Sequence, residues 1–310
     1  ANRLTGLVPG VLGAAITTVM YPTLAQLAAE NDWRRFSKAF AEAVKMINFV
    51  LIPVAVGMAV LRVPLIQLVF QRGAFDVQAT QATAWALLFY SPVVAASSLC
   101  DMTSRAFFAF QDSRTPMVIN TLGIGINIGL NLLLIGPLRH GGLALATSLA
   151  TVFGACTLLW MLRVRLRMLS RSSANSLSNT DSHLPAEIGK GQHPRNDYSF
   201  ADGPVGIGGK SILSSLWRVV LASALMGGVA WWSYVRLSFY VPGSNVALQA
   251  VRLLGAISAG TLSYGVAVWA LGVPELQVAF DGAQQVWYKA RSKIHDLRVG
   301  RKEDAAALKR

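Results

Sequence analysis

The sequence predicts an all-α protein, a polytopic transmembrane helical bundle with seven spans. Only 14% of its 310 residues are charged and 53% are hydrophobic, whereas soluble domains carry about 25% charged residues. The apolar residues also gather in blocks, and a helix needs about 20 apolar residues to cross the hydrocarbon core of a bilayer. Blocks of this length exclude a membrane barrel, because barrel strands alternate and span about 10 residues.

Seven runs without Asp, Glu, Lys or Arg define the expected spans in chain order. Two of the runs are short, so we expect their helices to extend into amphipathic flanks. The seven runs are 4–29, 46–61, 77–100, 115–138, 140–162, 219–235 and 253–274.

The first expected span, about 4–28, is rich in small residues. Gly6, Gly10 and Gly13 predict a face that packs closely on a neighbouring helix, since small residues let helices approach each other in lipid. The alternative is a helix that bends during transport. Pro9 and Pro22 are both expected to kink or break this span.

The segment 30–46, before the second run, is polar on one side only. We interpret it as an amphipathic helix that lies at the membrane interface and leads into the second span. Its apolar face holds Trp33, Phe36, Phe40, Ala43 and Ile47.

A short turn over 105–116 joins the third and fourth spans. We expect its aromatic residues, Phe107, Phe108 and Phe110, to lie at headgroup level. Asp112 to Pro116 is typical of a helix start, with Ser113 or Thr115 as the N-cap and a proline in the first turn.

The fourth span carries Asn120, Asn127 and Asn131, whose spacing places them on one helix face. An amide in hydrocarbon needs a hydrogen-bond partner. The row therefore predicts hydrogen bonds to a neighbouring helix; the alternative is the wall of a polar cavity.

Composition divides the chain into four parts. Residues 1–168 hold five spans. Residues 169–212 are rich in Ser, Gly, Asn and Pro, which predicts a disordered linker. Residues 213–273 hold two more spans. Residues 274–310 form a basic amphipathic tail, predicted to lie on the inner leaflet as a helix or, alternatively, to form a short coiled coil.

The formal net charge is +13. Of the 28 Lys and Arg, 21 follow the first, third and fifth spans or lie in the tail, and six lie on the opposite side. This bias predicts that the chain starts outside and that its C-terminus is cytoplasmic. It also predicts anionic membrane lipids as partners. Nucleic acid is not expected, because no basic patch carries base-stacking aromatic residues.

Motifs typical of catalysis are missing from the sequence. The four histidines lie far apart, and no zinc-protease, paired-cysteine or nucleophile-elbow pattern occurs. The stretch at 203–211, GPVGIGGKS, has Pro204 where a phosphate-binding loop needs its first Gly. Cys100 and Cys156 are expected to be packing residues. We therefore expect no enzyme activity, no cofactor and no bound metal.

Four stretches resemble MurJ-type lipid II flippases, the MviN family. The likeness runs from residue 1 to about 166 and, more loosely, over the last two spans. The stretches that carry it are 1–13 (ANRLTGLVPGVLG), 70–75 (FQRGAF), 105–116 (RAFFAFQDSRTP) and 141–150 (GGLALATSLA).

This resemblance implies a fold of fourteen helices in which two six-helix lobes face each other, with two extra helices behind. The seven predicted spans match helices eight to fourteen, so we expect a C-terminal half that lacks the first lobe. The resemblance also implies a bacterial cytoplasmic (inner) membrane protein of peptidoglycan and cell-wall biogenesis. Its substrate would be an undecaprenyl-pyrophosphate-linked precursor, moved by alternating access.

In that family, arginines line a cavity that holds the pyrophosphate. The resemblance places one of them at Arg3, preceded by Asn2 where some relatives carry an acid. A guanidinium offers a planar fork of donors that suits phosphate. A lone arginine at a helix end is also often an interface anchor. The resemblance further implies a groove beside the last two spans for the lipid tail.

Two other functions stay open. One is export of another lipid-linked oligosaccharide or antiport of a drug; an antiporter should carry an acid within a span, and none of the seven runs does. The other is a non-transporting membrane scaffold that binds cell-wall proteins through its linker and tail.

Overall fold

The computed structural model describes residues 5–6, 9–70, 76–138, 140–181, 209–240, 243 and 245–273. Within these residues every regular element is a helix. Seven of the helices are long and apolar enough to cross a membrane, and they follow the seven expected runs in order. The prediction of an all-α bundle with seven spans is confirmed.

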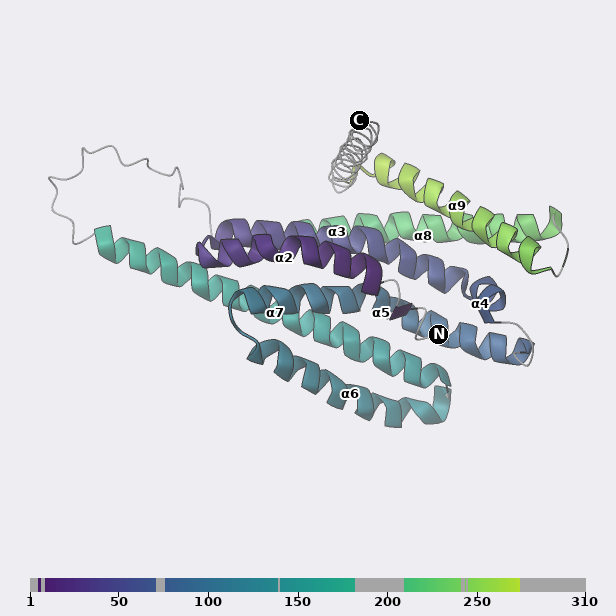
Figure 1. Cartoon of the computed structure of the whole chain (residues 1–310), viewed down its shortest axis with the longest axis horizontal. Coiled ribbons are helices and arrows are strands. Elements are labelled where there is room, and N and C mark those ends of the chain that lie inside the picture. The colour runs from purple at the N-terminus through teal and green to yellow at the C-terminus, as the bar shows by residue number, and fades with distance from the viewer. Residues whose placement is uncertain are drawn as a thin grey trace, which may run out of the picture.

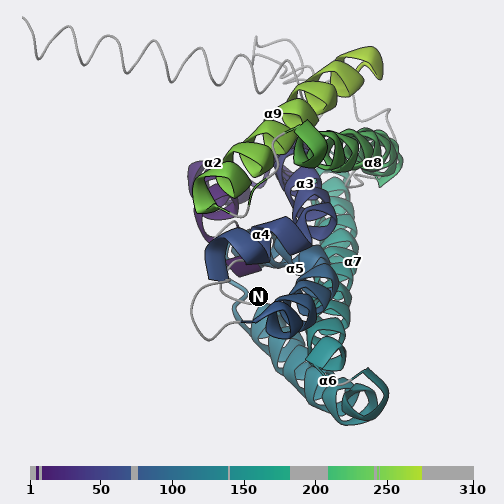
Figure 2. The same ribbon diagram turned by 90° about the vertical axis from the view of Figure 1, so that its right-hand side faces the viewer.

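The helices lie side by side along one axis, with α3 (Trp33–Val60) at the centre. It packs on α2 (Ala14–Ala29), on α5 (Val77–Ala109) and on α8 (Gly209–Tyr240). In both views α6 (Arg114–Leu138) and α9 (Val246–Ala270) lie at opposite margins of the bundle (Figures 1 and 2).

The N-terminal span is a π-helical turn, η1 (Pro9–Gly13), that leads directly into α2. Its proline is buried, and the irregular turn is where the sequence predicted a kink. α2 then continues through Pro22 without a break. The helix ends at a tight turn in which Asn31 takes a positive φ of 56°.

The amphipathic segment before the second run is not a separate interfacial helix. It is the first half of α3, a single helix of 28 residues. Its apolar face packs into the core, with Phe36, Phe40 and Ile47 all at 0% exposure and Trp33 partly buried against them. The expectation was wrong because an apolar face of this width suits a protein core as well as a membrane interface.

The aromatic residues of the 105–116 turn also pack inside the protein. Phe107 is buried, and the Phe110 ring lies 4.7 Å from Phe36 and 5.7 Å from Trp33, centroid to centroid. Only Phe108 is well exposed, at 45%. These contacts hold the α2–α3 turn against the α5–α6 turn, so both turns lie at the same end of the bundle.

The opposite end carries the short helix α4 (Arg62–Phe70), which follows α3 after a break at Leu61. It packs on α5 and touches α9. α5 then starts with Asp76 as its N-cap, whose carboxylate accepts a hydrogen bond from the N–H of Ala79 at 2.8 Å.

The helix α7 (His140–Asp181) continues well beyond the other helices at the end where the two turns meet (Figure 1). It therefore covers residues 169–181, the first part of the segment predicted to be a disordered linker. The rest of that segment up to 208, including the start of the phosphate-loop-like stretch, lies outside the described residues. The predicted tail at 274–310 lies outside them as well.

The last two spans form an antiparallel pair that joins the bundle through α3. The Tyr264 hydroxyl on α9 donates to the Phe49 carbonyl on α3 at 2.8 Å. At the far end of α9, Arg218 of α8 donates to the Gly272 carbonyl at 3.3 Å. The Tyr264–Phe49 bond thus ties the pair to α3, whereas the Arg218–Gly272 bond lies within the pair.

Candidate functional site

The two predicted substrate-binding residues, Asn2 and Arg3, lie outside the described residues. The structure therefore describes only the helix that follows them, η1 and α2, and the helices that hold it. Thr5, the first described residue, is 1% exposed.

A single glycine seats this helix on α5. A Cβ built on Gly13 would overlap the Ser98 hydroxyl oxygen and lie 3.0 Å from the Ser98 Cβ. The Gly13 carbonyl accepts a hydrogen bond from the Thr17 hydroxyl at 2.6 Å. By contrast, no described atom lies within 4 Å of a Cβ at Gly6 or Gly10. The predicted close-packing face therefore consists, in the described region, of Gly13 alone.

The Ser98 hydroxyl is buried at this contact without a hydrogen-bond partner among the described residues. A buried hydroxyl without a partner costs free energy. The packing of this span on α5 thus leaves a buried hydroxyl beside the π-helical turn.

The other side of α2 is open. Only 22% of the most apolar window of this span is buried within the described bundle. Val11 and Val19 are 67% and 73% exposed, and the polar residues Thr18 and Thr23 are exposed between them. This surface carries hydroxyl groups among its apolar side chains.

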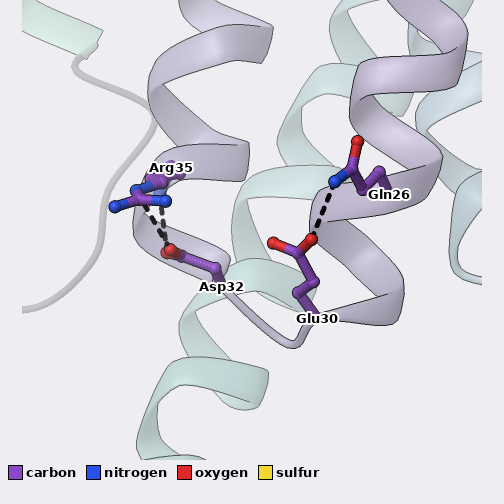
Figure 3. A network of polar contacts seen from close by, with 4 residues as sticks. All are labelled: Gln26, Glu30, Asp32 and Arg35. Carbon is purple, nitrogen blue, oxygen red and sulfur yellow. Dashed lines mark hydrogen bonds and ion pairs between the residues drawn. The ribbon is translucent and has the colours of Figure 1, made fainter. Parts of the chain in front are cut away.

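Ion pairing and capping fix the turn at the far end of α2 (Figure 3). The Asp32 carboxylate accepts a hydrogen bond from the Arg35 N–H at 3.0 Å and lies 3.4 Å from the Arg35 side-chain Nε. On the other side of the turn, the Gln26 amide donates to Glu30 at 2.9 Å. Asp32 therefore caps α3 and determines where the helix begins.

Asp112 caps the next turn, not Ser113 or Thr115 as predicted. Its carboxylate accepts from the Thr115 N–H at 3.1 Å and from the Thr115 hydroxyl at 2.8 Å. Burial by itself raises the pKa of the Asp112 carboxyl. These hydrogen bonds, a further one from the Arg114 N–H and the charge of Arg165 outweigh that effect and hold the pKa below its ordinary value.

Cationic side chains gather at this end of the bundle, around the starts of α3, α6 and α8 and the ends of α5 and α7. In the described part of the chain they are Arg34, Arg35, Lys38, Arg105, Arg114, Arg163, Arg165, Arg167, Arg171 and Arg218. At the opposite end the described part holds Arg62, Arg236 and Arg252. The charge bias of the sequence therefore corresponds to the two ends of one bundle.

Asparagines of α6 bond to α7, as the first of the two interpretations predicted. The Asn127 amide donates to the Thr147 hydroxyl at 3.3 Å, and the Asn131 amide donates to the Asn127 oxygen at 2.9 Å. Asn120 is exposed and takes no part in this cluster. The Asn131 amide oxygen is buried without a donor in the described region.

No group of three or more His, Cys, Asp or Glu side chains in the described residues is placed to hold a metal ion. The described residues carry guanidinium groups at both ends of the bundle and amide and hydroxyl groups within the spans. These groups suit the binding of a ligand and a conformational change.

Comparison with known proteins agrees with this geometry. The family model "Lipid II flippase MurJ" matches residues 1–250. A probable lipid II flippase MurJ of Vibrio cholerae is 23% identical over 88% of this chain and 45% of its own length. That of Haemophilus influenzae is 31% identical over 50% of this chain and 31% of its own. The chain therefore spans less than half the length of these curated relatives.

A solved structure has the same fold. "Lipid II flippase MurJ, inward closed conformation" superposes with a TM-score of 0.57 at 20% identity, over 87% of this chain and 46% of that one. Identity this low supports the fold alone. The family match over residues 1–250, together with seven spans in the expected order, shows that the chain belongs to the MurJ family of lipid II flippases.

Proposed function

We propose that the chain is the C-terminal half of a lipid II flippase of the bacterial inner membrane. It would move an undecaprenyl-pyrophosphate-linked peptidoglycan precursor from the inner to the outer leaflet. The family match over residues 1–250 carries this proposal. The curated relatives are more than twice as long as their matched part, which supports a further lobe as partner, and the resemblance implies that this lobe is N-terminal.

The mechanism we propose is alternating access between the two lobes. The open side of α2 is the surface that we assign to the cavity between them. Support comes from its low burial and from its exposed hydroxyl groups, Thr18 and Thr23. A hydroxyl group can donate a hydrogen bond to a hydrated headgroup that passes this surface and accept one from it.

We assign the pyrophosphate contact to Arg3, with Asn2 beside it. Their place directly before the helix with this open side supports the assignment. A guanidinium can bind two phosphate oxygens at once, and in a cavity shielded from water such charge-assisted hydrogen bonds are strong. The apolar outer sides of α8 and α9, which include Leu225, Leu254 and Leu262, would accompany the lipid tail.

The orientation follows from charge. The end that carries the α2–α3 and α5–α6 turns also carries most described cations, which supports a cytoplasmic location for it and for the C-terminus. Anionic lipids of the inner leaflet would then contact these cations.

The test restores an upstream half and measures complementation of a bacterium depleted of its own flippase. We expect Arg3→Ala to abolish growth and Arg3→Lys to restore part of it, because lysine keeps the charge but loses the fork of donors. Arg236→Ala is the matched control, since Arg236 lies near the end of α8 with its guanidinium 5.3 Å from the Trp232 ring centroid. Full growth with Arg3→Ala at normal protein levels would remove the site assignment.

Deletion variants separate transport from scaffolding. A flippase should keep most of its activity when residues 182–208 and 274–310 are removed, because the spans stay intact. A scaffold that binds cell-wall proteins through these segments would lose its function. Quantifying lipid II in each leaflet gives the answer directly.

A further inference from the structure

A groove of about 510 Å³ lies between the α3–α4 joint and α8, at the end of the bundle that carries α4. Its volume falls in the range of about 300–1,000 Å³ that is typical of ligand sites. No residue of α9 lines it. The lining residues are Val60, Leu61, Arg62, Val63, Pro64, Gly227, Gly228, Trp231, Tyr234 and Val235.

Two glycines of α8 make the groove. Gly227 allows α8 to approach α3, since a Cβ there would lie 3.0 Å from the Val56 Cγ1 and 3.1 Å from the Val60 Cγ2. Gly228 has no described atom within 4 Å of a Cβ, so it leaves open space. The space exists because α8 lies close to α3 and presents no side chain at position 228.

The groove follows α8, one of the helices long and apolar enough to cross a membrane. Its lining on α8 extends from Gly227 to Val235, which is about 12 Å of helix. Trp231, which is 58% exposed, and Tyr234 lie toward the end of the span, where aromatic side chains sit at headgroup level. Gly228 lies about one helical turn before Trp231, within the uncharged run 219–235. One end of the groove is therefore suited to a polar group and the other to an acyl chain.

Arg62 is the one charged residue of this lining. Its guanidinium donates one recorded hydrogen bond, to the Ala59 carbonyl at 2.9 Å, and the structure records no ion pair for it with a described residue. A guanidinium has five N–H donors, so most of them are left for a ligand.

Acidic residues are scarce near this end. Asp76 is the only Asp or Glu between residues 61 and 100, and none occurs between 231 and 274. Asp76 is engaged as the N-cap of α5. The groove therefore offers a positive charge to a ligand and no carboxylate that could bind a ligand's ammonium group.

The geometry points to a binding site for one anionic phospholipid of the surrounding bilayer, in the leaflet on the α4 side. Arg62 binds the phosphate, and an acyl chain lies along Gly228 and Val60. A headgroup without an ammonium, such as that of phosphatidylglycerol, fits this charge pattern better than phosphatidylcholine. The site is separate from the cavity surface of α2 and does not depend on the proposed transport.

The test measures lipid binding to the 310-residue chain in detergent micelles by native mass spectrometry. Phosphatidylglycerol and phosphatidylcholine with identical acyl chains are titrated separately. We expect Arg62→Gln to raise the Kd for phosphatidylglycerol about tenfold, as expected for loss of a charge-assisted hydrogen bond. The same variant should remove the preference over phosphatidylcholine. Arg62→Lys should retain part of that preference.

Gly228→Leu places a side chain in the groove at a position where no described atom lies within 4 Å of an added Cβ, and it should weaken the binding of both lipids. Arg236→Gln is the control, because its guanidinium lies 5.3 Å from the Trp232 ring centroid, at the same end of α8 but outside the groove. Thermal unfolding of each variant separates lost binding from lost folding. A folded Arg62→Gln protein that binds phosphatidylglycerol like the parent overturns the proposal, and so does an equal loss with Arg236→Gln.

Two competitors identify the source of the phosphate. Glycerol phosphate at millimolar concentration should leave the bound lipid in place, since the acyl chain supplies part of the affinity. Displacement by glycerol phosphate would mean a site for free anions. Displacement by undecaprenyl phosphate at lower concentration than by phosphatidylglycerol would mean a site for polyprenyl carriers. Either result overturns assignment to a phospholipid.

Discussion

The contact between Gly13 and Ser98 predicts that Gly13→Ala destabilises the bundle although alanine is the better helix former. Gly13 has ordinary helical angles, φ −66° and ψ −44°, so its backbone accepts any residue. The intrinsic gain of alanine over glycine is about 1 kcal/mol. This gain is opposed by the steric clash of the added methyl group. The methyl carbon would overlap the Ser98 hydroxyl and lie 3.0 Å from the Ser98 Cβ and 3.7 Å from the Leu51 Cδ1.

Overpacking of this kind costs about 1–3 kcal/mol. We therefore expect a net loss of about 0–2 kcal/mol in the free energy of unfolding. Ser98→Ala alone should be neutral or stabilising, because the hydroxyl has no recorded partner. In the Gly13→Ala/Ser98→Ala double variant, part of the clash disappears, so the two changes should couple by at least about 1 kcal/mol.

The matched control is Gly129→Ala in α6, where no described atom lies within 4 Å of the added Cβ. It should keep the full gain of about 0.5–1 kcal/mol. Reversible unfolding in mixed micelles, followed by circular dichroism, gives each free energy. The close approach of α2 to α5 would be refuted by two results together. Gly13→Ala would have to stabilise the protein as much as Gly129→Ala does, and its effect on the free energy of unfolding would have to be additive with that of Ser98→Ala.

Three further predictions concern the cap of α6, the contact between α6 and α7, and the orientation of the chain in the membrane. Asp112→Ala should cost about 1 kcal/mol of stability through loss of the cap. The pKa of Asp112 is lower in the folded state than in the unfolded state. The stabilisation by its carboxylate should therefore be present above the ordinary pKa of aspartate and be lost as the pH falls through the pKa of the folded state. Asp112→Asn should still cap the helix but without this pH dependence. A double-variant cycle of Asn127→Ala and Thr147→Val should show a coupling of about 0.6 kcal/mol, the average for hydrogen bonds between membrane helices, and additivity would contradict the bond. A membrane-impermeant thiol reagent applied to intact cells should label a cysteine at residue 68 and spare one at residue 190, and the reverse pattern would invert the proposed topology.

The seven spans were predictable because each depends only on its own composition. A bilayer treats every apolar run of sufficient length alike, whatever lies beside it. The segment before the second run was not predictable in the same way, because Phe36 and Phe40 would have suited lipid headgroups as well as the interior of a protein. Similarly, Asp112, Ser113 and Thr115 are all good caps, and the backbone geometry of the turn selected the first of them.

The candidate site also has parts that the sequence predicted and parts that it did not. The resemblance suggested Arg3 from its place in a motif, and no contact in the described residues tests it. A hydrogen bond from Asn127 to a neighbouring helix could be expected, but its partner Thr147 could not. A row of asparagines predicts only that a neighbouring helix provides a hydrogen-bonding group. The Gly228 groove had no signal of its own, because an isolated glycine in a helix looks the same whether it faces open space or a packed neighbour.

The sequence by itself determined that this is a membrane protein of seven spans and placed it in its family, since hydropathy, charge bias and short motifs are read along the chain. Tertiary structure alone decided which faces meet: α3 at the centre, Gly13 against Ser98, and Arg62 beside an unfilled stretch of α8. The physical reason is that insertion into lipid depends on one helix at a time. Packing depends on the shapes of two surfaces that can lie two hundred residues apart.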